Sequence, residues 1–96
     1  RSHASSLQAM LDRGEIDILT FTSSSTVENF MAAVGVDRRQ LVRKVPAICI
    51  GPVTAEAARR HGLRVEAIAH EYTVDGVVTA LTEWRKAQGS TLKEPV

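Results

Sequence analysis

The sequence has 96 residues, of which 44% are hydrophobic and 24% are charged, and its formal net charge at pH 7 is +1. This length fits one small domain. The balanced charge and the 4% share of aromatic residues argue against nucleic acid or a membrane surface as a partner. The lone cysteine, Cys49, lies in an apolar run, so we expect a buried side chain and a cytoplasmic protein. Because the chain starts at Arg1 without an initiator methionine, we also expect it to begin inside a longer protein.

The first half of the chain predicts two helices around a strand. Apolar residues at helical spacing favour a helix over residues 4–13, which Gly14 would end in the left-handed conformation. Residues 16–21 are mostly apolar and predict a strand. The next helix would begin near Thr26 and close at Gly35.

The start and the inner face of this second helix are open to specific predictions. Ser25 or Thr26 is a plausible N-cap, and Glu28 falls three residues after Ser25, as in a capping box. The buried stripe is predicted to be Val27, Phe30, Met31 and Val34.

The second half repeats the strand–helix alternation. Residues 37–44 predict a short basic helix or loop, whose arginines and lysine we interpret as a solvated face. Pro52 suits the first turn of a helix, and His61 suits a helix C-terminus. Strands are predicted over residues 45–50 and 63–69, the second of them half-exposed near a sheet edge, and a last helix over 73–88. The inward face of that helix would be Val74, Val77, Val78, Leu81 and Trp84.

Strands that alternate with helices predict an α/β fold, a parallel sheet with right-handed crossovers and helices on both faces. Residues 1–88 would form the domain and residues 89–96 a flexible tail. Because three strands are few for such a sheet, we expect further strands to come from elsewhere. They would belong to the rest of a longer protein or to a second copy.

Three loops join a predicted strand to a helix start, at residues 22–26, 51–54 and 70–73. In a parallel sheet these loops share one edge, where helix N-termini offer unpaired N–H groups to anions. For any single serine, ordinary helix capping is the better explanation. Three such loops on one edge favour a binding site for carboxylate or phosphate.

No catalytic set stands out in the sequence, and no cluster of metal ligands does either. The serine loop lacks the glycines of a nucleophile elbow, and no glycine-rich phosphate loop with a lysine is present. His70 and Tyr72 lie in the third loop, where Tyr72 could donate a hydrogen bond to a ligand or simply pack. We therefore predict binding residues but no catalytic residue and no metal.

Three segments resemble the uroporphyrinogen-III synthase family. They are TFTSSSTV at residues 20–27, followed by Asn29 and Phe30; ICIGPVTA at 48–55, followed by Gly62 and Leu63; and AHEYTVDG at 69–76. They occur in the family's order, and the resemblance covers roughly residues 7–85.

The resemblance implies a flavodoxin-like α/β domain of an enzyme of tetrapyrrole biosynthesis. The family cyclises hydroxymethylbilane to uroporphyrinogen III, with inversion of ring D through a proposed spiro intermediate and loss of water, and it needs no cofactor. Its substrate lies between two α/β domains, one of which is built from both chain termini. This segment resembles the C-terminal part of that domain and would supply one wall of the cleft, so the isolated chain is expected to be inactive. It also resembles versions fused to a uroporphyrinogen methyltransferase.

Matching residue by residue, the resemblance implies substrate contacts in each of the three loops. The expected substrate-binding residues are Thr22, Ser23, Ser24 and Ser25, then Gly51, Val53 and Thr54, and more weakly Tyr72 and Thr73. A tyrosine proposed in the family to assist loss of the hydroxyl would lie upstream of this segment, so Tyr72 does not correspond to it. Two other interpretations remain open: a non-catalytic α/β module that binds a carboxylate or phosphate ligand, and a purely structural domain.

Overall fold

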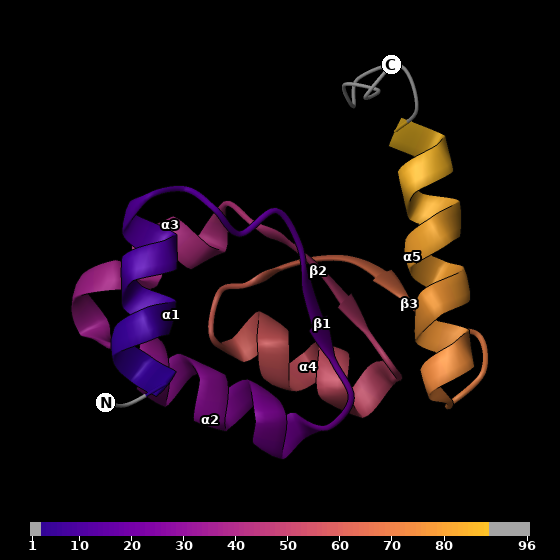
Figure 1. Ribbon diagram of the computed structural model, residues 1–96. Coiled ribbons are helices and arrows are strands. Elements are labelled where there is room, and N and C mark those ends of the chain that lie inside the picture. The colour runs from indigo at the N-terminus through magenta and orange to yellow at the C-terminus, as the bar shows by residue number, and fades with distance from the viewer. Residues whose placement is uncertain (1–2, 89–96) are drawn as a thin grey trace.

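A parallel three-stranded sheet forms the centre of the molecule. The computed structural model describes residues 3–88, and the predicted tail at 89–96 lies outside them. The strands are β1 (Leu19–Phe21), β2 (Pro46–Cys49) and β3 (Arg64–Ile68), in the order β1-β2-β3, and both neighbouring pairs are parallel. The predicted α/β class with a parallel sheet is confirmed (Figure 1).

Helices cover both faces of this sheet, as predicted (Figure 1). One face carries the packed group of α1, α2, α3 and α4, and α5 lies on the other. The helix bounds are α1 His3–Asp12, α2 Ser24–Val34, η1 Val36–Arg38 (a 3₁₀ turn), α3 Arg39–Arg43, α4 Pro52–Arg60 and α5 Val74–Gln88. Gly14 and Gly35 end α1 and α2 with positive φ, as the sequence predicts.

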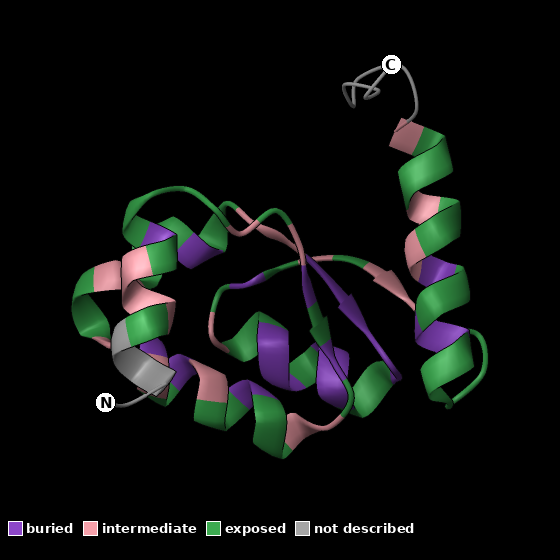
Figure 2. Ribbon diagram, in the orientation of Figure 1, coloured by how far each residue is buried: buried purple, intermediate pink, exposed green. Residues whose placement is uncertain are grey.

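The core is divided by the sheet into two clusters of buried side chains. The larger joins β1 and β2 to α1, α2, α3 and α4, and it includes Val27, Val34 and the fully buried Cys49. The smaller joins β2 to α5 through Ile48 and Val77. Figure 2 shows buried residues along the inner side of α4 but only on a short part of α5. The first face is therefore much the better covered of the two.

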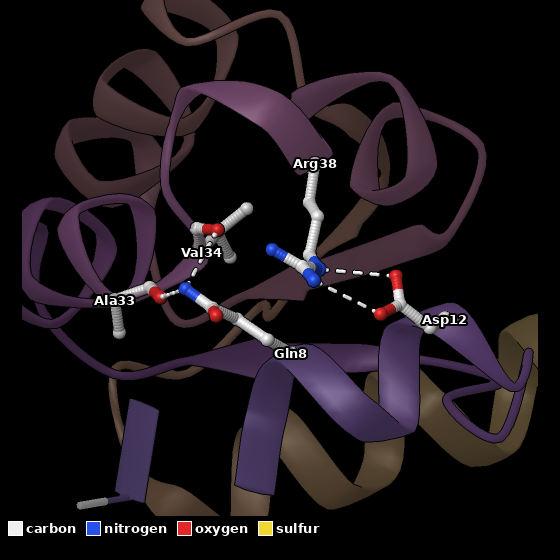
Figure 3. A network of polar contacts seen from close by, with 5 residues as sticks. All are labelled: Gln8, Asp12, Ala33, Val34 and Arg38. Atoms are coloured by element: carbon white, nitrogen blue, oxygen red, sulfur yellow. Dashed lines mark hydrogen bonds and ion pairs between the residues drawn. The ribbon is translucent and has the colours of Figure 1, made fainter. Parts of the chain in front are cut away.

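Contacts across loops fix α1 to the end of α2 (Figure 3). The Gln8 side chain donates to the carbonyl oxygens of Ala33 at 3.0 Å and Val34 at 3.4 Å, which are orphan acceptors in the last turn of α2. The Arg38 guanidinium donates to both carboxylate oxygens of Asp12 at 3.0 Å each. These bonds hold α1 against α2 and η1 in the group of helices on this face of the sheet.

Strand β1 is shorter than predicted. The ladder places Leu19 opposite Ala47, so Ile18 would have to pair with Pro46, which begins β2. Proline has no N–H to donate, and no strand residue of β2 precedes it. Residues 16–18 therefore enter the sheet without ladder bonds.

The predicted inner face of α5 is partly wrong. Val77 is 5% exposed and Leu81 and Trp84 pack on the smaller cluster, but Val74 is 65% exposed and Val78 is 54% exposed. The helix contacts β2 and β3 along a narrow stripe that includes Val77 and Ala80. Gly76 is also buried, but it faces the backbone of Glu71 in the loop before α5.

Candidate functional site

The three strand-to-helix loops lie side by side at the carboxyl edge of the sheet. Backbone bonds continue across the strand ends, from Ile50 N–H to Phe21 O at 3.0 Å and from Ala69 N–H to Cys49 O at 2.8 Å. The starts of α2, α4 and α5 are thereby arranged along one edge (Figure 1). This is the arrangement that the sequence predicts for an anion site.

In the first loop, Ser23 is the N-cap of α2, not Ser25 or Thr26. The Ser23 hydroxyl accepts from the Thr26 N–H at 3.1 Å, and the Thr26 hydroxyl accepts in return from the Ser23 N–H at 3.2 Å. The capping box thus uses a threonine at its third position, where the sequence pattern suggested Glu28. Glu28 instead lies 2.9 Å from His61, the C-cap of α4.

The remaining hydroxyls of this loop are not engaged in capping. Ser25 shares a 3.1 Å contact with the Ser23 hydroxyl and is exposed. Ser24 is half-buried, Thr22 is exposed, and no side-chain hydrogen bond of either is found within residues 3–88. Ser24 occupies the first helical position, so its hydroxyl stands beside the N–H groups of the first turn.

The second loop leaves its helix without a side-chain cap. Gly51 is the N-cap of α4, Pro52 follows at the first helical position, and no side chain bonds to the first turn. The N–H groups of Val53 and Thr54 belong to the set that an α-helix cannot pair internally. Thr54 is buried as a whole residue, with 1% of its surface exposed, whereas the neighbouring Val53 is 69% exposed.

The third loop folds back on the start of α5. The Thr73 hydroxyl accepts from the Gly76 N–H at 2.9 Å, and the Thr73 N–H donates to Glu71 O at 2.8 Å. The Thr73 hydroxyl therefore serves as a cap. Tyr72 is 69% exposed, and its ring lies against Gly51 of the second loop.

A surface pocket of about 250 Å³ opens between the third loop and the first turns of α5. It is lined by His70, Glu71, Gly76 and Thr79. No role was predicted from the sequence for Glu71 or Thr79. The helical spacing of Gly76 and Thr79 indicates only that these two residues share a face of α5. Nothing in the sequence indicated the contact between Tyr72 and Gly51.

The electrostatics of this edge come from the backbone. The loops at 22–26, 51–54 and 70–73 contain no lysine or arginine, and three helix dipoles begin there. Cys49 is fully buried, and burial raises the pKa of its thiol, which disfavours the reactive thiolate. Between residues 3 and 88 no group of three or more His, Cys, Asp or Glu residues is placed to hold a metal ion. The donors that this edge presents are backbone N–H groups of helix starts and the hydroxyls of the first loop.

No helix in the described part of the chain has the length and apolar character needed to cross a membrane.

Comparisons with known proteins agree on one family. The family model described as uroporphyrinogen-III synthase HemD matches residues 1–79. The porphyrin biosynthesis protein HemD of Ruminiclostridium josui is 40% identical over 70 residues, which are 73% of this chain and 13% of that protein. The putative uroporphyrinogen-III synthase of Methanothermobacter thermautotrophicus is 35% identical over 95% of this chain and 38% of its own length. The uroporphyrinogen-III synthase of Synechococcus elongatus is 38% identical over 79% of this chain and 30% of its own length.

The chain therefore spans well under half the length of each of these relatives. No solved structure matches it at a significant level.

Proposed function

The chain belongs to the uroporphyrinogen-III synthase family, and we propose that it supplies one wall of the substrate cleft of such an enzyme. The full protein would cyclise hydroxymethylbilane to uroporphyrinogen III, inverting ring D. The hydroxyl of the terminal hydroxymethyl group leaves, and its methylene carbon bonds to the substituted α-carbon of ring D. The older bond from that carbon to the neighbouring methylene then breaks and re-forms at the free α-carbon of ring D. The hydrogen lost from that α-carbon and the departed hydroxyl together make the released water.

The observation that carries this proposal is the uncapped start of α4 between two other helix starts. Ser23 and Thr73 cap α2 and α5, but no side chain caps α4. An uncapped helix start binds a carboxylate through its N–H groups and its dipole. The substrate carries many carboxylates, and this edge of the sheet has donors spread over three loops.

Each of the three loops would bind some of these carboxylates. Ser24 and Ser25 would donate hydroxyls, with Thr22 and Ser23 beside them, and Gly51, Val53 and Thr54 would contribute the backbone of the second loop. Tyr72 and Thr73 are the weaker candidates of the third loop. We assign no acid, base or nucleophile to this chain, so its share in catalysis is to orient the substrate.

Residues 1–88 would form the C-terminal part of a larger domain in a cytoplasmic enzyme. The opposite wall of the cleft and further strands of the sheet would come from the remainder of the protein or from a second copy. The exposed face of β1 supports this, because Thr20 is exposed there and β1 lies at the sheet edge.

The test compares Ser24→Ala with Ser6→Ala in the full-length protein that carries this segment. Ser6 is an exposed serine of α1. It lies outside the three loops, so it serves as a matched control. With hydroxymethylbilane as substrate, Ser24→Ala should raise KM by about tenfold, the value of one hydrogen bond to a charged group. Ser6→Ala should leave KM unchanged.

Two results would contradict the proposal in different ways. A wild-type protein that forms no uroporphyrinogen III would refute the activity. An unchanged KM for Ser24→Ala in an active enzyme would refute the site. Tight binding of inorganic phosphate by the wild-type protein, without binding of hydroxymethylbilane, would instead support the non-catalytic binding module.

A further inference from the structure

Tyr72 is exposed, yet its ring lies against the neighbouring loop. A Cβ atom added at Gly51 would lie 2.9 Å from Tyr72 Cδ1 and 3.1 Å from Cε1, so the ring rests on the glycine where a side chain would otherwise stand. Gly51 has φ −165° and ψ 177°, an extended conformation that any residue adopts. A side chain at this position would therefore displace the ring, whereas the backbone geometry alone would accept any residue.

The other end of the third loop is held just as closely. A Cβ at Gly76 would collide with the carbonyl oxygen of Glu71, so the loop backbone is packed directly on the first turn of α5. The bonds of Thr73 to Glu71 and Gly76 close this short segment on itself. Tyr72 thus projects from a segment that is anchored to α5, and its ring reaches across to the start of α4.

We propose that Tyr72 is a positioning residue that couples the second and third loops into one wall. Its ring on Gly51 sets the spacing between the uncapped first turn of α4 and the β3–α5 loop, and so sets where substrate groups bound by the two loops lie. The inference rests on the proposed function for its consequence, which is control over ring inversion. The ring, and not the phenol hydroxyl, carries the coupling.

The chain itself permits a direct test of the contact. Tyr72 is its only tyrosine, so a sample with labelled tyrosine gives one set of ring signals in NMR spectra. We expect a nuclear Overhauser effect between these ring protons and the Gly51 α-protons. Gly51→Ala should abolish the native ring position and shift the signals, whereas Val36→Ala, at an exposed valine of η1, should not.

The functional test uses four variants of the full-length protein: Tyr72→Ala, Gly51→Ala, the two together, and Tyr72→Phe. Each variant is assayed with hydroxymethylbilane for the ratio of uroporphyrinogen III to the uninverted isomer, and its melting temperature is measured. Tyr72→Ala and Gly51→Ala should each lower the ratio by about tenfold, a loss typical of misplaced reacting groups. The double variant should be no worse than either single one, and Tyr72→Phe should keep the wild-type ratio.

The possible failures are distinguishable. Wild-type-like isomer ratios in both single variants of an active enzyme would overturn this inference and leave the proposed function intact. Additive losses in the double variant, or a loss in Tyr72→Phe equal to that of Tyr72→Ala, would overturn the coupling through the ring. A wild-type protein without synthase activity would overturn the proposed function and the role in inversion with it. Should Gly51→Ala fail to fold, the comparison of Tyr72→Ala with Tyr72→Phe decides the matter.

Discussion

Neighbouring serines in the first loop have different tasks. The Ser23 hydroxyl accepts from the Thr26 N–H and completes a reciprocal cap, so this hydrogen bond stabilises α2. Ser24, one residue later, has a hydroxyl with no side-chain bond in the part of the chain that the structure describes. A run of similar residues therefore separates into one that stabilises the helix and one that is available to a ligand.

Stability measurements should separate these tasks. Ser23→Ala should lower the free energy of unfolding of the 96-residue chain by about 1 kcal/mol, because the Thr26 N–H loses its acceptor. Ser24→Ala should change it by less than about 0.5 kcal/mol. Urea denaturation followed by circular dichroism gives both values. Equal losses for the two variants would show that Ser24 also has a structural role.

The sequence predicts such residues as a group but not their individual roles. The hydroxyl residues before Val27 indicate a helix start, yet residues 22–26 all carry hydroxyls, and which of them is the cap depends on where β1 ends. The contact of Tyr72 with Gly51 depends on the pairing of β2 with β3, which brings two distant loops together. Contacts of this kind depend on tertiary structure and leave no local pattern.

At the scale of elements, α1 is attached to the sheet layers by packing and by a few polar contacts. The bidentate pair of Arg38 with Asp12 joins α1 to η1, and the hydrogen bond from Arg38 holds the pKa of the Asp12 carboxyl below its ordinary value. A carboxyl whose pKa is lowered by folding stabilises the fold above its unfolded pKa. That stabilisation is lost as the pH falls through the lower pKa of the folded state.

Asp12→Asn should therefore destabilise the chain at pH 7, and the difference from wild type should shrink as the pH falls below about 4. Melting temperatures of the two proteins across this range check the prediction. Asp17→Asn is the control, because Asp17 is exposed and has no ion pair within residues 3–88. A difference for Asp12→Asn that is the same at pH 7 and at pH 3 would rule out the ion pair as its cause.

The order of elements was predictable because strand and helix periodicities alternate clearly along this chain. The parallel sheet, the helices on both faces and the edge position of β3 follow from that order and are confirmed. The inner face of α5 was not predictable, because Val74, Val77 and Val78 are equally apolar. Which of them is buried depends on how much of the helix the two strands beneath it can cover.

At the scale of the whole molecule, the two faces of the sheet are unequally covered. Four helices cover one face, whereas on the other α5 contacts β2 and β3 and leaves Val74 and Val78 exposed. Thr20 of β1 is exposed as well. Beside β1, the sheet edge and this part of its face are open to further structure, in line with a chain that spans well under half the length of its relatives.

The placement of the three loops along one edge leads to a prediction about activity. Ring inversion requires both reacting ends of a flexible linear substrate to be held in one geometry, and that demands surfaces on both sides of it. Within residues 3–88, the three strand-to-helix loops all lie along one edge of the sheet. We therefore expect it to bind hydroxymethylbilane weakly and to form no uroporphyrinogen III, while the full-length protein forms it.

The measurement is an isomer analysis of the products after incubation with each protein, with calorimetric titration to follow binding. Because the linear substrate also closes without an enzyme, the ratio of isomers, and not the total yield, is the informative quantity. A chain that merely holds carboxylates should leave the uninverted isomer dominant at every protein concentration. Formation of the inverted isomer by the isolated chain would show that one wall suffices or that two copies supply both walls. A rate of formation that rises with the first power of the chain concentration would indicate one wall, and a rate that rises with the second power would indicate two copies.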